Sequence, residues 1–208
     1  MKAILQRVLS ASVTVEKEVV SSIGKGVLVF AAVAPGDTQK EADSLAAKVL
    51  KMKLWDDDTG AKVWLRYPLL FIFVGRGSDL PIVPFLYLTC VPSQWKYNVQ
   101  EIGGEVLCVS QFTLLASTKK GNKPDFHGAA GGEEAKRLYH YFFEKVQQGY
   151  GPDKVHNGVF QAMMEVALVN DGPVTLEISA LPKADLKAEK KAEKKADPGP
   201  SSVSTPSN

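Results

Sequence analysis

The spacing of apolar residues in the first 34 positions predicts β-strands. Apolar side chains recur at Ile4, Val8, Val13 and Val15, and the run Val27–Val33 is continuously apolar. Short apolar runs bounded by glycine or proline are typical of strands that are buried on both faces. We therefore expect this part of the chain to form the centre of a sheet.

Two later segments have the 3.6-residue period of helices. Thr38 and Glu41 have the spacing of a capping box, which predicts that a helix begins there. The apolar positions are Ala42, Leu45, Ala46 and Val49 in this helix, and Ala135, Leu138, Tyr139, Phe142 and Val146 in a second helix over residues 133–148. In each helix these residues share one face, so we expect both helices to cover a sheet.

Strand patterns account for much of the remaining sequence up to residue 180. The predicted strands are Lys53–Asp57, Glu105–Leu115, Phe160–Leu168 and Val174–Ile178. The last two are separated by the turn sequence Asn170–Pro173. A chain with many strands and two helices predicts a single mixed α/β domain over residues 1–180.

Residues 181–208 have a different composition. They are rich in Lys, Ala and Glu and then in Pro and Ser, so they have almost nothing to bury and are expected to be disordered. This tail carries the net charge of +2, because the rest of the chain is neutral overall. Broad electrostatic binding of nucleic acid by the domain is therefore not expected. We favour a solubilising tail over one that contacts RNA phosphates.

The residues that most often bind metals show no suitable spacing. Cys90, Cys108, His127, His140 and His156 lie far apart, and no glycine-rich nucleotide loop is present. We expect no metal and no cofactor. The N-terminus lacks the pattern of a signal peptide and the two cysteines do not suggest a disulfide framework, so we expect a cytoplasmic protein without a membrane segment.

Four local sequences resemble the D-aminoacyl-tRNA deacylase family, also called the D-tyrosyl-tRNA deacylase family. They are MKAILQRVLSASVTV at the N-terminus, SQFTL at 110–114, GNKPDF at 121–126 and NDGPVT at 170–175. The similarity covers roughly residues 1–62 and 95–179 and is of the fungal type. It implies a barrel-like mixed-sheet domain of the family's fold, a homodimer with the active site shared across the interface, and tRNA as the partner.

The resemblance implies hydrolysis of D-aminoacyl-tRNA, and of glycine mischarged on tRNA-Ala, to free amino acid and tRNA. This ester is already activated, so the enzyme must hold the carbonyl, stabilise an oxyanion and admit water. By resemblance, Phe112 and Thr113 supply main-chain N–H donors, and Ser110 and Gln111 line the pocket. Thr113 is either a nucleophile or a positioning residue while the 2′-hydroxyl of the tRNA assists. We favour positioning, because no His or Lys is near it in sequence.

The resemblance also assigns a chiral filter to a cis Gly172–Pro173 bond that reaches into the partner subunit's active site. The Gly172 carbonyl would accept from the substrate ammonium, and the Cβ of an L-residue would collide with the Gly-Pro backbone. Asn170 and Thr175 flank the bond and are expected to fix its geometry, and Arg7 is expected to hydrogen-bond this loop. Alone, the Asn-Asp-Gly-Pro sequence would predict only a turn.

Residues 63–94 depart from the family. Their two apolar halves are each shorter than the roughly 20 residues that cross a bilayer. We hypothesise that this segment is a retained intron that is translated in frame. Every valine codon begins with GT, so the codon of Val63 permits a splice donor, and the codon of Gln94 can be CAG, which permits a splice acceptor. The alternative is a genuine loop or a membrane-touching element, which as an exposed apolar loop would favour aggregation.

Two classes of function therefore stay open. The first is a homodimeric editing esterase, which the intact SQFT and NDGPVT sequences favour. The second is a nucleic-acid-binding protein that retains the fold. A third possibility is an isoform that the insertion inactivates.

Overall fold

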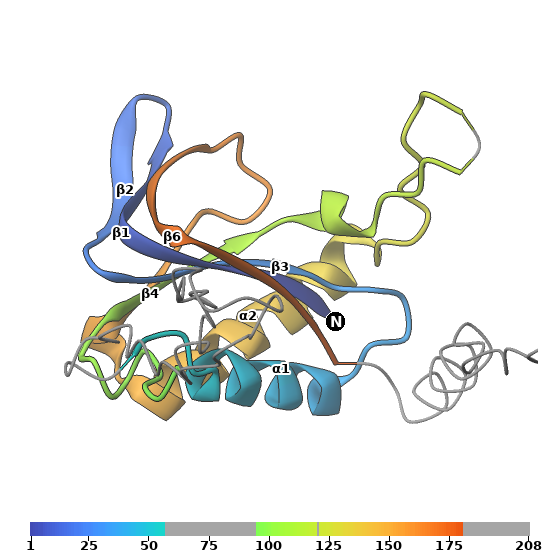
Figure 1. The fold of residues 1–208 in the computed structure, drawn as a ribbon. Helices are drawn as coiled ribbons and strands as arrows, with labels where there is room; N and C mark the ends of the chain where they lie inside the picture. Colours follow the sequence, from blue (N-terminus) through green and yellow to red (C-terminus); the bar gives the residue numbers. More distant parts are fainter. Residues whose placement is uncertain (57–94, 120, 181–208) are drawn as a thin grey trace, which may run out of the picture.

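The computed structural model describes residues 1–56, 95–119 and 121–180 (Figure 1). The anomalous segment 63–94 and the tail 181–208 lie outside these residues, so what we expect of both stays a prediction. The strands are β1 (Lys2–Val15), β2 (Glu18–Ile23), β3 (Gly26–Ala32), β4 (Glu105–Ser110), β5 (Val155–Asn157) and β6 (Glu165–Ser179). The helices are α1 (Gln39–Lys51) and α2 (Gly132–Tyr150), with short 3-10 turns η1 (Phe112–Leu115) and η2 (Pro152–Lys154).

The six strands form one mixed sheet, and β1 is its central element. Its neighbours are antiparallel: β6 pairs along most of one edge, and β3 and β2 pair in turn along the other. β4 and β5 continue the sheet in parallel from β3. The sheet curves until it is nearly closed into a barrel, and α1 and α2 lie side by side beneath it (Figure 1). The predicted barrel-like domain with two covering helices is therefore confirmed.

The continuous apolar run of β3 is explained by two hydrophobic clusters, one on each face of the sheet. Val27, Val29 and Ala31 face the helices and join the larger cluster, whereas Leu28 joins the smaller one. All four side chains are buried. As predicted, this run has buried side chains on both faces of the sheet.

Both helices follow their predicted patterns. Thr38 and Glu41 form the capping box, in which the Thr38 N–H donates to Glu41 Oε2 at 2.9 Å. In α2 the predicted residues Leu138, Tyr139, Phe142 and Val146 are buried, while Ala135 is partly buried and packs on the same core. The helices pack against the sheet through these faces.

One predicted strand ends earlier than expected, and another forms only a single bridge in the described residues. The strand predicted over Glu105–Leu115 ends at Ser110, because the chain then turns and Leu114 N–H donates to the Gln111 carbonyl at 3.2 Å. Of the strand predicted at 53–57, the described part makes only an isolated bridge between Trp55 and Tyr97. A local apolar pattern cannot show where a turn redirects the backbone.

The C-terminal strands also differ from the prediction. Residues 160–162 turn and bend, and residues 163 and 164 are irregular rather than part of a strand, because Gln161 has a φ of 63° and Ala162 N–H donates to the Val159 carbonyl. β6 begins at Glu165 and continues to Ser179, and the predicted break survives only as a bulge within it. Sequence analysis missed β5, which at three residues is too short to give a periodic pattern.

Candidate functional site

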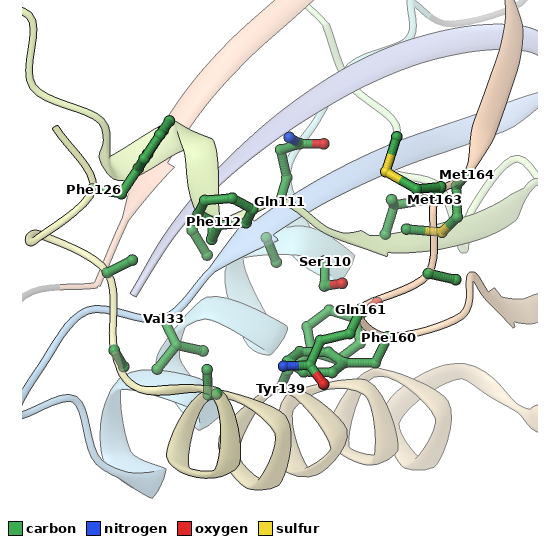
Figure 2. Close-up of a pocket in the computed structure, with 18 of the residues that line it drawn as sticks. Val33, Ser110, Gln111, Phe112, Phe126, Tyr139, Phe160, Gln161, Met163 and Met164 are labelled. Carbon is green, nitrogen blue, oxygen red and sulfur yellow. The ribbon is translucent and has the colours of Figure 1, made fainter. Parts of the chain in front are cut away.

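A pocket of about 580 Å³ lies where β3 and β4 end and α2 begins (Figure 2). This volume is within the range of small-molecule sites. Its walls are mostly apolar, and Ser110, Gln111 and Gln161 supply polar groups. The larger apolar and aromatic residues that line it are Val33, Phe112, Phe126, Tyr139, Phe160, Met163 and Met164.

The Ser110–Thr113 turn forms one side of this pocket. β3 and β4 are parallel and pair Ala31 with Ser110, after which the chain turns into η1. Ser110, Gln111 and Phe112 line the pocket, whereas Thr113 does not. Gln111 Nε2 donates to Thr113 Oγ1 at 2.5 Å, so the Thr113 hydroxyl is hydrogen-bonded to a residue that lines the pocket.

Two exposed aromatic rings, those of Phe112 and Phe126, lie at the mouth of the pocket. Phe112 is 57 % exposed and meets Phe126 edge-on, with ring centroids 5.2 Å apart. Phe126 ends the GNKPDF sequence, and residues 121–125 of that sequence belong to a loop that is closed by paired main-chain hydrogen bonds between Ser117 and Asp125. This loop projects away from the body of the molecule in Figure 1.

The buried end of the pocket was not predicted as a site. Tyr139 comes from α2 and Phe160 from the turn before β6, and their ring centroids are 5.6 Å apart. The Tyr139 hydroxyl donates to Asn157 Oδ1 at 2.6 Å, and burial raises the pKa of Tyr139 well above its ordinary value. The hydroxyl therefore stays protonated and fixes the ring. The sequence assigned Tyr139 to the core and Phe160 to a strand, and no local signal links the two.

The NDGPVT sequence forms a bulge in β6 directly opposite Arg7. The register passes from Arg7 opposite Val174 to Val8 opposite Asn170, so residues 171–173 bulge out of the ladder. The Gly172–Pro173 peptide bond is cis, as expected, and Gly172 has a φ of 118°. An added Cβ at Gly172 would lie 2.9 Å from Arg7 Nη2.

Arg7 connects this bulge to the rest of the domain. Its Nε donates to the Asp171 carbonyl at 3.0 Å and lies 3.2 Å from Asp171 Oδ2, and its Nη1 donates to the Leu54 carbonyl at 2.5 Å. The expected contact between Arg7 and the loop is therefore present. Asn170 and Thr175 flank the bulge in the ladder with β1, opposite Val8 and Gln6.

The predicted site residues fall into two groups within one chain. Ser110, Gln111 and Phe112 line the pocket, and Thr113 is hydrogen-bonded to Gln111. None of the loop residues lines it, namely Arg7, Asn170, Gly172, Pro173 and Thr175. A single chain does not bring the two groups together in one pocket.

Metal and membrane features can be described only for part of the chain. Within residues 1–56, 95–119 and 121–180, no three His, Cys, Asp or Glu side chains are grouped so that they could hold a metal. Over the same residues, no helix is long and apolar enough to cross a membrane.

In the loop before α2, the His127 N–H donates to Asp125 Oδ1 at 2.9 Å and lowers the pKa of that carboxyl.

The fold and this pocket are those of a deacylase-like mixed-sheet domain, and comparisons with known proteins identify the family. The family model described as D-Tyr-tRNA(Tyr) deacylase matches residues 4–66 and 87–179. The chain therefore belongs to this family, which confirms the predicted family and enzyme class. The residues left unmatched between these two blocks, 67–86, lie within the anomalous segment 63–94.

Individual relatives agree with this result. The D-aminoacyl-tRNA deacylase of Yarrowia lipolytica is 43% identical over 178 residues, which are 85% of this chain and 96% of that protein. The Saccharomyces cerevisiae protein of the same name is 38% identical over 85% of this chain and 96% of its own length. A solved structure described as "c-Myc DNA Unwinding Element Binding Protein" is 36% identical, has a TM-score of 0.69, and is matched over 88% of this chain and all of that chain.

Proposed function

We propose that this protein hydrolyses the ester bond of D-aminoacyl-tRNA, releasing the free D-amino acid and tRNA. The observation that carries the proposal is the pocket beside the Ser110–Thr113 turn, in a chain that belongs to the deacylase family. This activity is the one in the names of its relatives. A protein that edits tRNA during translation is expected in the cytoplasm.

The pocket suits the 3′-terminal adenosine of the tRNA. Its buried end offers the Phe160 ring, and stacking of a base on an aromatic side chain contributes about 1–3 kcal/mol. Ser110 and Gln111 lie on the β4 side, where the ester would follow the ribose. The N–H groups of Phe112 and Thr113 begin the η1 turn, and we assign them to the oxyanion that forms on the carbonyl oxygen.

Thr113 acts in this proposal as a positioning residue. Its hydroxyl accepts from the Gln111 amide, and an amide in either orientation is too weak a base to remove the hydroxyl proton. The 2′-hydroxyl of the terminal ribose is then the group that assists the attack of water. Gln111 keeps the Thr113 side chain next to the ester without activating it.

We further propose that the Gly172–Pro173 loop selects the substrate in the pocket of a second subunit. The loop is exposed and does not line its own pocket. Leu9 and Val169, on the paired strands β1 and β6 beside it, are each 52 % exposed, and a second copy of the chain would cover them. The site is incomplete without that copy, which supports a homodimer.

Selection by this loop is steric. Arg7 holds the backbone of Asp171, so the bulge presents a fixed surface to the substrate. The Cβ of an L-residue would collide with that surface, whereas the side chain of a D-residue points away from it. Glycine has no Cβ, so glycine mischarged on tRNA-Ala would also be hydrolysed.

Deacylation by the purified protein tests the proposal. We expect rapid hydrolysis of D-tyrosyl-tRNA and of glycyl-tRNA-Ala, and little hydrolysis of L-tyrosyl-tRNA. Sedimentation should show a dimer, and Leu9→Arg should convert it into a monomer with low activity on all three substrates. Hydrolysis of the D- and L-esters at equal rates would contradict the filter, and an active monomer would contradict the shared site.

A second candidate is a nucleic-acid-binding protein that retains the fold without turnover. One observation favours it: the structural relative at 36% identity is described as binding a DNA unwinding element. Binding of tRNA or DNA without release of the amino acid would support this candidate, or the inactivation of this isoform by its insertion. The variant that lacks residues 63–94 separates the two, because removing the insertion would restore turnover only to an inactivated enzyme.

A further inference from the structure

Gln161 has an uncommon backbone conformation at the edge of the pocket. Its φ of 63° is in the left-handed region, which residues with a Cβ rarely adopt. The residue follows Phe160 in the turn that Ala162 N–H closes onto the Val159 carbonyl. The turn holds a long polar side chain where glycine would fit without conformational cost.

The side chain of Gln161 lines the pocket at its edge, where the residue is exposed. It is on the same side of the pocket as Phe160 and Tyr139, and Ser110 lies across from it (Figure 2). A Cβ built on Gly132, in the first turn of α2, would lie 2.9 Å from Gln161 Nε2. Within the described residues the Gln161 amide makes no hydrogen bond, so its donor and its acceptor are both available to a ligand.

We propose that Gln161 determines specificity by recognising an edge of the terminal adenine. Its Oε1 accepts from the N6 amino group, and its Nε2 donates to the adjacent ring nitrogen. Adenine presents a donor beside an acceptor, and a glutamine amide matches this pair with two parallel hydrogen bonds. Stacking on Phe160 alone would accept any base. This inference rests on the proposed function, because it takes the ligand to be the aminoacylated end of tRNA.

The test compares short substrates that differ only in the base. These are the D-tyrosyl esters of adenosine, purine riboside and 7-deazaadenosine, together with their non-hydrolysable amide analogues for calorimetry. Purine riboside lacks the N6 amino group, and 7-deazaadenosine lacks one candidate ring nitrogen. For the unchanged protein we expect KM for the purine riboside ester to exceed that for the adenosine ester by at least about fivefold, with kcat similar.

Gln161→Gly should abolish this difference between bases. The KM for the adenosine ester should rise to that for the purine riboside ester, while kcat changes little. Because glycine adopts a positive φ readily, the variant should melt at the same temperature as the unchanged protein or above it. Loss of base discrimination in a stable protein cannot come from unfolding.

Gly132→Ala provides a second perturbation that leaves Gln161 in place. Its Cβ would displace the Gln161 amide, while alanine favours the helix over glycine. The variant should therefore lose discrimination without losing stability, and it should have no further effect in the Gln161→Gly background. Gly131→Ala is the matched control, because its Cβ would meet no atom within 4 Å.

The outcomes of these measurements distinguish the role of Gln161 from the hydrolytic function. Equal KM values for the adenosine and purine riboside esters in the unchanged protein, or discrimination retained by Gln161→Gly, would overturn the role of Gln161 while leaving the deacylase intact. If the esters resist hydrolysis while the adenosine amide still binds more tightly than the purine riboside amide in a Gln161-dependent way, the hydrolytic function fails and the assignment of Gln161 stands. Failure of both binding and hydrolysis would overturn both.

Discussion

Replacing Arg7 by lysine tests how the substrate-selecting loop is held. The Arg7 guanidinium reaches the Leu54 carbonyl on one side and Asp171 on the other. Lysine keeps the positive charge but places it on a single nitrogen, which lacks the planar fork of arginine. Arg7→Lys should therefore lose at least one of these main-chain hydrogen bonds.

The cost follows from the burial of the groups left behind. The Arg7 side chain is 13% exposed, and Leu54 is 1% exposed, so water has little access to the Leu54 carbonyl. Leaving a buried acceptor without a partner costs about 1–3 kcal/mol. For a domain of this size each kcal/mol lowers the Tm by about 2–4 °C, so we expect a fall of roughly 2–12 °C.

The assay combines thermal melting with the rates of D- and L-tyrosyl-tRNA hydrolysis. A looser loop should reject the L-ester less well, so the ratio of D to L rates should fall along with the Tm. Lys2→Ala is the matched control on the same two strands, because Lys2 pairs with Glu177, which is 56% exposed, and an exposed ion pair contributes at most about 1 kcal/mol. If Arg7→Lys melts like the control and keeps the D-to-L ratio, Arg7 does not hold the loop.

Three further predictions concern other parts of the chain. Thr113→Ala should lower kcat only in part, and complete loss in a folded variant, or a trapped acyl-threonine, would show covalent catalysis. Burial raises the pKa of the Cys108 thiol to about 12. Because the unfolded thiol ionises first, near pH 8.5, denaturant melts should show stability falling as pH rises above this value, and Cys108→Ala should lack this contribution. Deleting residues 63–94 should raise the Tm and preserve deacylation, because Trp55 and Tyr97 already pair where the described chain resumes. A lower Tm, with no spliced transcript found, would make the segment a genuine structural element.

The sequence predicted those features that depend on neighbouring positions in the chain. The capping box of α1 and the two-sided burial of β3 follow from local spacing. The Ser110–Thr113 turn and the Gly172–Pro173 loop were predicted only through family resemblance.

The buried end of the pocket could not be predicted, because Tyr139 and Phe160 meet only after α2 packs beside the turn that precedes β6. Nor does a sequence pattern show that Gln161 adopts a left-handed φ. The separation of the Gly172–Pro173 loop from the pocket of its own chain depends on the register of β6 against β1, and this register appears only in the folded sheet.

The bulge in β6 also affects how the protein resists aggregation. In the part of the chain that the structure describes, β6 pairs only with β1, so its other edge is open along 15 residues. A long open edge is a template on which another strand can assemble. The bulge at residues 171–173 divides this edge, and Pro173 has no N–H to offer an incoming strand. Residues 171–173, which contain the Gly172–Pro173 bond that we assign to substrate selection, therefore also prevent β6 from acting as one continuous template.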